Sequence, residues 1–458
     1  MFTARTVLNH SIRFVAVFVL AWSAAQGGKL LAESAGIAVD VQSRWWPLSC
    51  FQWKVPGVRA PWSDLGRAAG TLAAFYAFVQ WFLRRVTGSA ALVVLAGLFF
   101  VIGTNLIHGA HYGLAHPHVG SNQDSPGAAR QYYHDATQVA SAGQFLRDFE
   151  KTQSTLGCHS RTHPPGAVLL IYGLAKCVRH PTAISLVMAA LSVGLSGCFL
   201  YRILSRELDP DTCGYVTLLF LLIPAVQVYY CATLDAVIAS CCLGVLAYLR
   251  RPNPILGGAG MITWLFCASL LSFGACFLVP VVVGFELVTR RSVRRSVAVV
   301  LGVAALYTVV YLLWGFNYLG AFSTASALEN PGGFLALSEP VSYAITRVEN
   351  VADIVLFFGP FLLVLSARGI SELRRHRACS ELLTLTGLGV LTLLAMFLAG
   401  TFRTGETARA CLFIYPYLMF PVACHLHHRG YCDADMRLLL WLVFGQSLAM
   451  QTLGGYCW

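Results

Sequence analysis

One polar stretch of the chain collects the residue types that acid–base catalysis and phosphate binding require. It runs from His108 to Gly166 and is bordered by apolar segments. Its middle holds Tyr133-His134-Asp135, and its end reads His159-Ser160-Arg161-Thr162-His163-Pro164-Pro165-Gly166. Connections longer than about 12–15 residues are usually functional or disordered. The length and composition of this stretch therefore indicate a candidate functional site.

Each charged group in the stretch has a functional and an ordinary explanation. Asp135 could take a proton from a substrate hydroxyl, or it could be a solvated or helix-capping aspartate. The two prolines after His163 fix the backbone and hold this histidine extended, although Pro-Pro also marks helix starts. Arg161 suits contact with a phosphate, either of a substrate or of a lipid headgroup.

Further candidates lie at the ends of apolar runs, where charged groups beside a bilayer are costly and so often functional. Asp235 precedes such a run, where it is either a helix cap or a functional group. Arg409 begins a late run and is expected to pair with Glu406, three residues earlier, or with an anionic ligand. Arg347 and Glu349 raise the same question before another run.

The composition is that of an integral membrane protein. Of 458 residues, 57% are hydrophobic and only 12% are charged, whereas soluble domains have roughly 25% charged residues. The net charge of +11 comes from short basic clusters between apolar runs, which is typical of topology signals and argues against a nucleic-acid partner. The 15 cysteines include no CxxC pair, so neither a zinc site nor a disulfide framework is predicted.

The apolar runs predict the fold class. A helix of about 20 residues crosses a hydrocarbon core of about 30 Å, and lipid leaves backbone groups no other partners. We therefore expect an all-α, polytopic integral membrane protein with about 13 transmembrane helices. The expected spans are 14–31, 67–83, 88–107, 181–201, 213–230, 234–249, 255–272, 274–289, 296–314, 350–367, 382–400, 409–426 and 436–453.

Two of these assignments have alternatives. The residues from 255 to 289 are predicted to form a hairpin of two spans, because one helix of that length would exceed the membrane thickness. The first apolar run is predicted to be a retained span, and a cleaved signal peptide is the alternative.

The arginine clusters set the orientation of the spans. All of them fall on the side of the N-terminus, which the positive-inside rule makes cytoplasmic. The clusters begin at Arg84, Arg202, Arg250, Arg290 and Arg368. This agreement requires that 165–179 is no span, and we expect it to be an amphipathic helix in the membrane interface.

The chain is expected to form one domain over 1–458. Residues 1–87 would add N-terminal spans and a tryptophan-rich outer loop. The first large outer loop, 108–180, would carry most of the candidate residues, and 315–349 would form a second outer loop. These non-cytoplasmic loops and interfacial helices would together form the site.

The order of these features resembles the type C glycosyltransferase (GT-C) superfamily, in its branch of protein O-mannosyltransferase-like and aminoarabinose-transferase-like bacterial membrane enzymes. The likeness rests on Tyr133-His134-Asp135, on His163-Pro164-Pro165 at the end of the same loop, on Asp235, and on the segment from Arg409 to Pro416. It covers roughly Leu106 to Pro421 and lies in order and topology more than in any single motif.

The resemblance implies that a sugar is transferred from a polyprenyl-phosphate-linked donor to a glycan, lipid or protein acceptor. This would happen on the non-cytoplasmic face of a bacterial-type inner (plasma) membrane. Asp135 would be the catalytic base, and Arg161, His163 and Arg409 would bind the donor phosphate. The remaining pocket residues would be Tyr133, His134, Asp235, Glu406 and Arg347. No cofactor is certain in this superfamily, and a divalent metal ion, Mg²⁺ or Mn²⁺, would be held by Asp135 and Asp235.

Two other classes of function compete with this one. A polymerase or ligase of lipid-linked glycans would share the large outer loop with its Arg and His residues. A transporter or lipid flippase would line broken helices with charged groups and would show two similar halves. The candidates map to loop ends and no internal repeat is visible, which favours the transferase.

Overall fold

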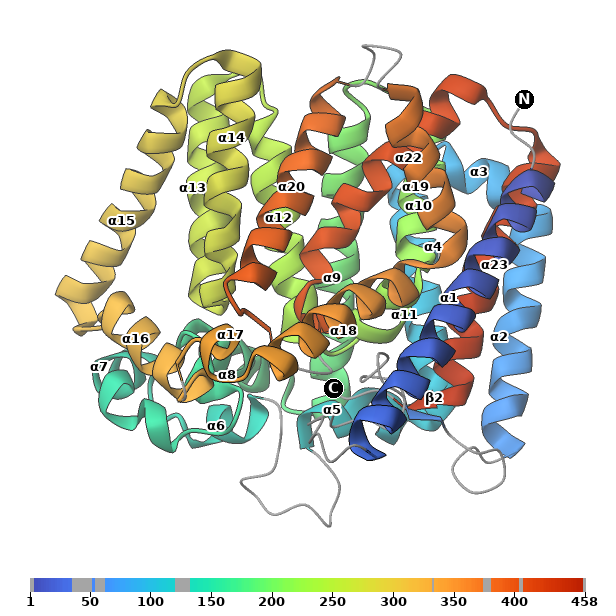
Figure 1. Ribbon diagram of the computed structural model, residues 1–458. Helices are drawn as coiled ribbons and strands as arrows, with labels where there is room; N and C mark the ends of the chain where they lie inside the picture. Colours follow the sequence, from blue (N-terminus) through green and yellow to red (C-terminus); the bar gives the residue numbers. More distant parts are fainter. Residues whose placement is uncertain are drawn as a thin grey trace. The chain divides into compact units, whose positions relative to one another are not determined.

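The chain is an all-α protein, as expected from its sequence (Figure 1). The computed structural model describes residues 4–34, 52–53, 62–119, 132–331, 333–373, 380–402 and 407–455. Within these residues the β-structure is one two-residue antiparallel ladder, between β1 (Gln52–Trp53) and β2 (Gly454–Gly455). Internal contacts divide the chain into two compact units, which are described separately.

Unit 1 comprises Met1–Ile107, Leu204–Val228 and Phe334–Cys457. Its helices are α1 (Ala4–Ser34), α2 (Trp62–Trp81), α3 (Leu83–Thr87), α4 (Ala90–Asn105), η1 (Leu106–His108), α10 (Pro210–Leu222), α11 (Pro224–Tyr229), α17 (Leu335–Ser338), α18 (Pro340–Phe358), α19 (Pro360–Leu373), α20 (Ser380–Leu398), α21 (Thr407–Ala410), η7 (Leu412–Ile414), α22 (Tyr415–Arg429) and α23 (Asp433–Leu453). At its centre α10 packs against α4, α22 and α23, and α22 packs against α19 and α20.

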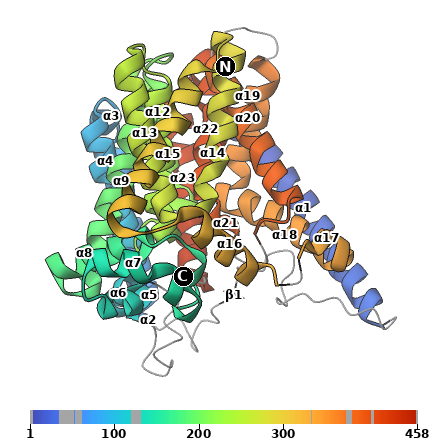
Figure 2. The same ribbon diagram turned by 90° about the vertical axis from the view of Figure 1, so that its left-hand side faces the viewer.

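Unit 2 comprises His108–Ile203 and Tyr229–Gly333, together with the terminal residue. Its helices are η2 (His111–Ala115), α5 (His116–Val119), α6 (Tyr133–Gln138), α7 (Ala142–Thr152), η4 (Gln153–Thr155), η5 (Ser160–Thr162), α8 (Gly166–Val178), α9 (Pro181–Leu204), α12 (Leu234–Leu249), α13 (Pro254–Leu271), η6 (Phe273–Phe277), α14 (Leu278–Arg290), α15 (Arg294–Trp314) and α16 (Tyr318–Glu329). The short helices α6, α7, α8 and α16 gather at one end of the long helices α13–α15 (Figures 1 and 2).

Every predicted span falls on helical segments, but several of these segments are too short to cross a bilayer alone. The span expected at 409–426 is divided among α21, η7 and α22, which is a further correction. Within the described residues, seven helices have the length and composition of a span, or eight if the bent pair α18 and α19 counts as one. The helices α8, α10 and α12 are apolar but shorter, with 13, 13 and 16 residues. The chain is therefore a membrane protein with several spanning helices.

The hairpin expected between 255 and 289 is confirmed. Asn253 caps α13, because its Oδ1 accepts hydrogen bonds from the backbone N–H groups of Ile255 and Leu256, both at 3.0 Å. The helix ends at Leu271, and the Ser272 hydroxyl then accepts from the N–H of Gly274 at 3.1 Å. The chain reverses here before α14 begins.

Two predicted spans are broken at prolines, which is a correction. The span expected at 213–230 ends its first helix at Ile223, which is extended (ψ 153°) because Pro224 follows it. The carbonyl groups freed by the break are satisfied: Gln227 Nε2 donates to the oxygen of Leu221 at 2.6 Å, and Ser447 Oγ donates to that of Leu222 at 2.6 Å. Side chains therefore replace the lost helical donors, as a buried helix break requires.

The second break corrects the span expected at 350–367. Helix α18 starts ten residues earlier, at Pro340, and ends before Gly359, whose φ of 93° belongs to the left-handed region. Pro360 then begins α19 at an angle of 98° to α18. The polar residues Arg347 and Glu349 therefore lie within a helix and not in a loop before one.

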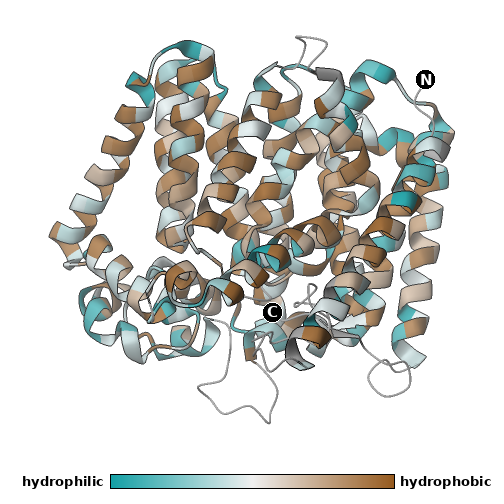
Figure 3. Cartoon of the chain, in the orientation of Figure 1, coloured by the Kyte–Doolittle hydropathy of each residue, from teal (hydrophilic) through white to brown (hydrophobic). Residues whose placement is uncertain are grey.

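The polar stretch from His108 to Gly166 is largely helical in its described part. Its helix α7 presents Leu146 and Phe149 to Phe316 and Ala321 of the segment around α16, and the rings of Phe149 and Phe316 meet edge to face at 5.7 Å. These apolar side chains therefore dock the stretch onto the rest of unit 2. Figure 3 shows that this end of unit 2 is more hydrophilic than its long helices.

Candidate active site

Asp135 lies in the first turn of α6 and is half-buried. Its Oδ2 accepts a hydrogen bond of 3.0 Å from the backbone N–H of Gly157. A side chain at position 157 would crowd this bond, since a Cβ there would lie 2.9 Å from Oδ2. Within the described residues Oδ1 makes no hydrogen bond. One carboxylate oxygen is therefore fixed, and the other is available to a substrate.

The aromatic residue before this turn ties it to the His-Pro-Pro segment. The Tyr132 ring is 6% exposed and meets the His163 ring edge to face, with 5.5 Å between centroids. His163 Nδ1 donates to the carbonyl oxygen of His159 at 3.0 Å, so its Nε2 can donate to an anion only when the ring is protonated. The middle and the end of the polar stretch, about 30 residues apart in sequence, are thus in contact.

Arg161 belongs to the same cluster. Its backbone N–H donates to the oxygen of Gly157 at 3.0 Å, and its own carbonyl oxygen accepts from Gln153 Nε2 at 3.0 Å. The fully buried Gln153 also donates to the oxygen of Ala321 in α16 at 2.9 Å. The guanidinium group is half-buried and makes no ion pair or hydrogen bond within the described residues. Its backbone is fixed while its charge is uncompensated.

A buried histidine that was not among the residues predicted from the sequence lies against Tyr133. His118 in α5 is 2% exposed, and its ring centroid is 6.1 Å from that of Tyr133. Neither ring nitrogen has a hydrogen-bond partner among the described residues, and burial lowers the pKa of His118 from 6.5 to about 4. The preceding turn, η2, is a π-helix, a rare form that is frequent at functional sites.

Two further candidates of unit 2 lie in the first turns of α6 and α12. His134 is half-buried, and its carbonyl oxygen accepts from the Thr137 hydroxyl at 2.7 Å. Asp235 lies in the first turn of α12, but the cap is Thr233, whose Oγ1 accepts from the N–H of Ala236 at 3.4 Å. The capping explanation for Asp235 is therefore wrong, although its charge still favours the positive end of the helix dipole.

The metal prediction involved Asp135 and Asp235. Across the described part of the chain, no group of three or more His, Cys, Asp or Glu side chains is placed to hold a metal ion. Metal use stays a prediction that rests on the resemblance alone.

The guanidinium group of Arg347, in unit 1, donates hydrogen bonds to backbone carbonyl oxygens. Its Nη1 donates to the oxygens of Phe397 at 2.5 Å and Thr401 at 2.8 Å, and its Nη2 donates to that of Phe402 at 2.6 Å. The guanidinium also lies 5.1 Å from the centroid of the Tyr343 ring. Arg347 therefore caps the end of α20, a role that basic side chains often take at helix C-termini.

Arg409 lies in a buried polar region of unit 1. It is 5% exposed in α21, which packs against α18. The Thr407 hydroxyl of α21 donates to Asn350 Oδ1 at 2.5 Å, and the neighbouring acids Glu349 and Asp353 of α18 are fully buried. Glu406, the partner expected for Arg409, lies outside the described residues.

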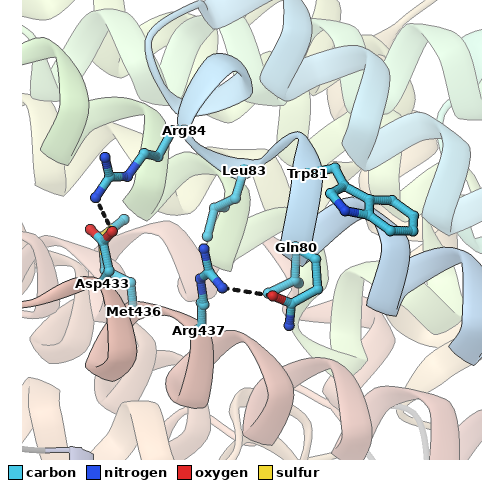
Figure 4. Close-up of a pocket in the computed structure, with 8 residues that line it drawn as sticks. Gln80, Trp81, Leu83, Arg84, Asp433, Met436 and Arg437 are labelled. Atoms are coloured by element: carbon cyan, nitrogen blue, oxygen red, sulfur yellow. Dashed lines mark hydrogen bonds and ion pairs between the residues drawn. The ribbon is translucent and has the colours of Figure 1, made fainter.

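A separate pocket of unit 1, of about 90 Å³, contains none of the predicted site residues (Figure 4). Arg84 pairs with Asp433 at its edge, and Arg437 Nη1 donates to Gln80 Oε1 at 2.7 Å. The close-up shows the Trp81 ring directed away from these pairs. This pocket lies beside a basic cluster that the sequence assigns to the cytoplasmic side.

Comparison with known proteins gives no independent assignment. No family model matches the chain, and no curated protein matches it.

Proposed function

We propose that this chain is a membrane glycosyltransferase that moves a sugar from a polyprenyl-phosphate-linked donor to an acceptor hydroxyl. The observation that carries the proposal is the cluster around Gly157. Its N–H holds one oxygen of Asp135, and its carbonyl oxygen fixes the backbone of Arg161, whose guanidinium has no partner among the described residues. A carboxylate and an uncompensated cation that are both hydrogen-bonded to Gly157, one through its side chain and one through its backbone, suit a reaction that removes a proton and releases a phosphate.

In the proposed step, Asp135 Oδ1 takes the proton of the acceptor hydroxyl while the hydroxyl oxygen attacks the anomeric carbon. The bond between that carbon and the phosphate oxygen breaks, and the electron pair leaves with the phosphate. Arg161 stabilises the charge that develops there, and a protonated His163 would add a second donor. The acceptor would be a glycan, a lipid or a protein.

The membrane arrangement is part of the proposal. The chain would cross a bacterial-type inner membrane about 13 times, with a cytoplasmic N-terminus and the Asp135 cluster on the non-cytoplasmic face. The shorter helices α10 and α12 are almost entirely buried by protein, so they need not match the lipid thickness by themselves. Helix α8 has 13 residues, or about 20 Å at 1.5 Å per residue, and would lie in the interface.

The proposal is tested by a transfer assay with the purified protein in lipid nanodiscs. A panel of undecaprenyl-phosphate sugars with radiolabelled sugar groups is supplied together with simple glycosides, diacylglycerol and a serine-containing peptide as acceptors. We expect labelled product and free undecaprenyl phosphate in equal amounts from at least one pair. Absence of product from every pair, with folded protein, contradicts the proposal.

A second candidate function, a transporter of lipid-linked sugars, is favoured by one observation. The bent pair α18 and α19 carries the fully buried polar residues Glu349, Asn350 and Asp353, and charged groups on a broken helix are a feature of transporters. Proteoliposomes separate the two functions. Transport would move the lipid-linked sugar between leaflets and depend on Glu349 and Asp353, whereas transfer would consume the donor and depend on Asp135.

A further inference from the structure

His118 is a buried titratable side chain that the proposed reaction does not use. It is 2% exposed, and neither Nδ1 nor Nε2 has a partner within the part of the chain that the structure describes. Because burial lowers the pKa of His118 to about 4, the ring is neutral at pH 7. One nitrogen then donates a hydrogen bond and the other accepts one.

The neutral imidazole of His118 lacks hydrogen-bond partners for both of its nitrogens among the described residues. A buried donor and a buried acceptor without partners destabilise the folded protein, and such groups call for a specific explanation, such as a bound ligand or water. No protein group fills either role among the described residues. Groups supplied by a bound molecule would satisfy both nitrogens.

The position of the ring connects it to Asp135. Helix α5 packs against α6, and the ring of His118 lies beside that of Tyr133, two residues before Asp135. The Tyr133 hydroxyl also makes no hydrogen bond within the described residues. Asp135 itself contacts a different segment, which leads through Gly157 to Arg161. Helix α6 thus contacts His118 through Tyr133, and it contacts the segment of Arg161 through Asp135 and Gly157.

We propose that His118 and Tyr133 bind the acceptor and that this acceptor is a sugar. Its hydroxyl groups would form hydrogen bonds with both ring nitrogens of His118. The assignment as acceptor rests on the proposed function, whereas sugar binding at this pair does not. A single serine or threonine hydroxyl could form a hydrogen bond with only one of the two ring nitrogens, because these point away from each other. A polyhydroxylated molecule offers several groups that both donate and accept. Tyr133 adds a hydroxyl and an apolar ring face.

The test measures binding without turnover. Methyl glycosides of glucose, mannose and galactose are titrated separately into the protein in lipid nanodiscs, and the thermal unfolding midpoint is followed, because a ligand that binds only the folded state raises it. N-acetylthreonine N-methylamide serves as the probe for a protein acceptor. We expect at least one glycoside, and not the amide, to raise the midpoint of the wild-type protein in a saturable way.

The variants assign the binding to this pair. His118→Phe keeps a ring but removes both nitrogens, and we expect it to weaken the glycoside affinity about 10–100-fold, as the loss of two neutral hydrogen bonds does. Tyr133→Phe removes one hydroxyl and should weaken it about 3–10-fold. The matched controls His111→Phe and Tyr112→Phe alter exposed rings of the neighbouring turn and should bind like the wild type. Tyr133→Phe keeps the test valid if His118→Phe does not fold.

The outcomes separate this inference from the proposed function. The inference is overturned if no glycoside shifts the wild-type midpoint, if the amide shifts it equally, or if the His118 and Tyr133 variants respond like the wild type. Asp135→Asn should still bind the glycoside. If that variant also transfers sugar at the wild-type rate, the proposed function fails while the sugar site at His118 stands.

Discussion

Asp135 acts, in the proposed reaction, through the one carboxylate oxygen that Gly157 leaves uncommitted. The hydrogen bond from the Gly157 N–H fixes Oδ2 at 3.0 Å, so the position of Oδ1 depends on a backbone atom 22 residues away. The sequence predicted Asp135, Arg161 and His163 as candidates from their types and spacing. It could not predict Gly157 or Gln153, because nothing local distinguishes a glycine or glutamine that contacts a distant residue.

Gly157→Ala should therefore reduce transfer while leaving the protein folded. The added methyl group would lie 2.9 Å from Oδ2 of Asp135 and would push this short side chain aside. A displacement of about 1 Å can cost about 100-fold in rate, so we expect a 10–100-fold fall in the transfer rate with little change in the unfolding midpoint. Unchanged transfer would show that the contact does not position the carboxylate.

The burial of His118 should lower the free energy of unfolding in acid. The pKa of the ring is 6.5 when it is exposed and about 4 in the folded chain, because burial disfavours the charged form. Between pH 6.5 and about pH 4, the ring therefore binds a proton in the unfolded state but not in the folded state. The stabilisation is complete above about pH 6.5 and is lost as the pH falls through about 4, by roughly 3 kcal/mol at most.

The check compares unfolding midpoints at pH 7 and pH 5. His118→Phe should lose less stability than the wild type between these two values, because it has no proton to gain. His111→Phe, with an exposed ring at the start of η2, should behave like the wild type. An equal acid loss in all three proteins would contradict the burial argument.

At the scale of elements, apolar runs predicted where helices lie but not where they break. Hydropathy averages over Pro224 and Pro360 because their neighbours are apolar, yet each proline ends one helix and begins another. The prolines themselves carried the signal, since a residue before proline avoids the helical region. The side chains that satisfy the breaks, such as Gln227 and Ser447, come from contacts that no local pattern encodes.

Gly166 shows why the His-Pro-Pro sequence is followed by glycine. A Cβ at this position would lie 2.3 Å from the carbonyl oxygen of Leu270, at the end of α13. Helix α8 can therefore approach α13 only if residue 166 has no side chain, and this approach holds the end of the Arg161–His163 segment. Gly173, in the same helix, has open space at the corresponding position.

Gly166→Ala should lower the unfolding midpoint and the transfer rate together, because the backbone oxygen of Leu270 cannot yield as a flexible side chain would. Overpacking of this kind typically costs about 1–3 kcal/mol. Gly173→Ala is the matched control and should be neutral or slightly stabilising, since alanine favours a helix over glycine by up to about 1 kcal/mol. Equal midpoints for the two variants would exclude the close approach.

At the scale of the whole molecule, the sequence predicted an all-α membrane protein correctly because lipid restricts backbone structure so strongly. The sequence cannot predict which distant segments meet, because side-chain patterns within one helix do not name its partners. Asp135, Arg161 and His163 belong to unit 2, and Arg347 and Arg409 belong to unit 1. Within unit 2, contacts join the first three, and within unit 1, Arg347 is committed to capping a helix.

Two native cysteines test the proposed orientation of the chain. Cys158 and Cys432 are both exposed, and the span order puts Cys158 outside and Cys432 in the cytoplasm. A membrane-impermeant maleimide applied to intact cells should label Cys158, and Cys432 should be labelled only after the cells are opened. Mass spectrometry of the two peptides measures both. The reverse pattern would invert the topology and put the Asp135 cluster on the cytoplasmic side.

The central claim is that Asp135 is the base of a sugar transfer, and its most direct test is the transfer rate of Asp135→Asn in nanodiscs with the donor and acceptor pair that the wild type uses. Asparagine keeps the shape and the Gly157 hydrogen bond but cannot take the proton, so we expect a loss of about 100-fold or more. Asp148→Asn, which changes a half-buried carboxylate of the neighbouring α7, should retain the wild-type rate. Wild-type transfer by folded Asp135→Asn would contradict the account.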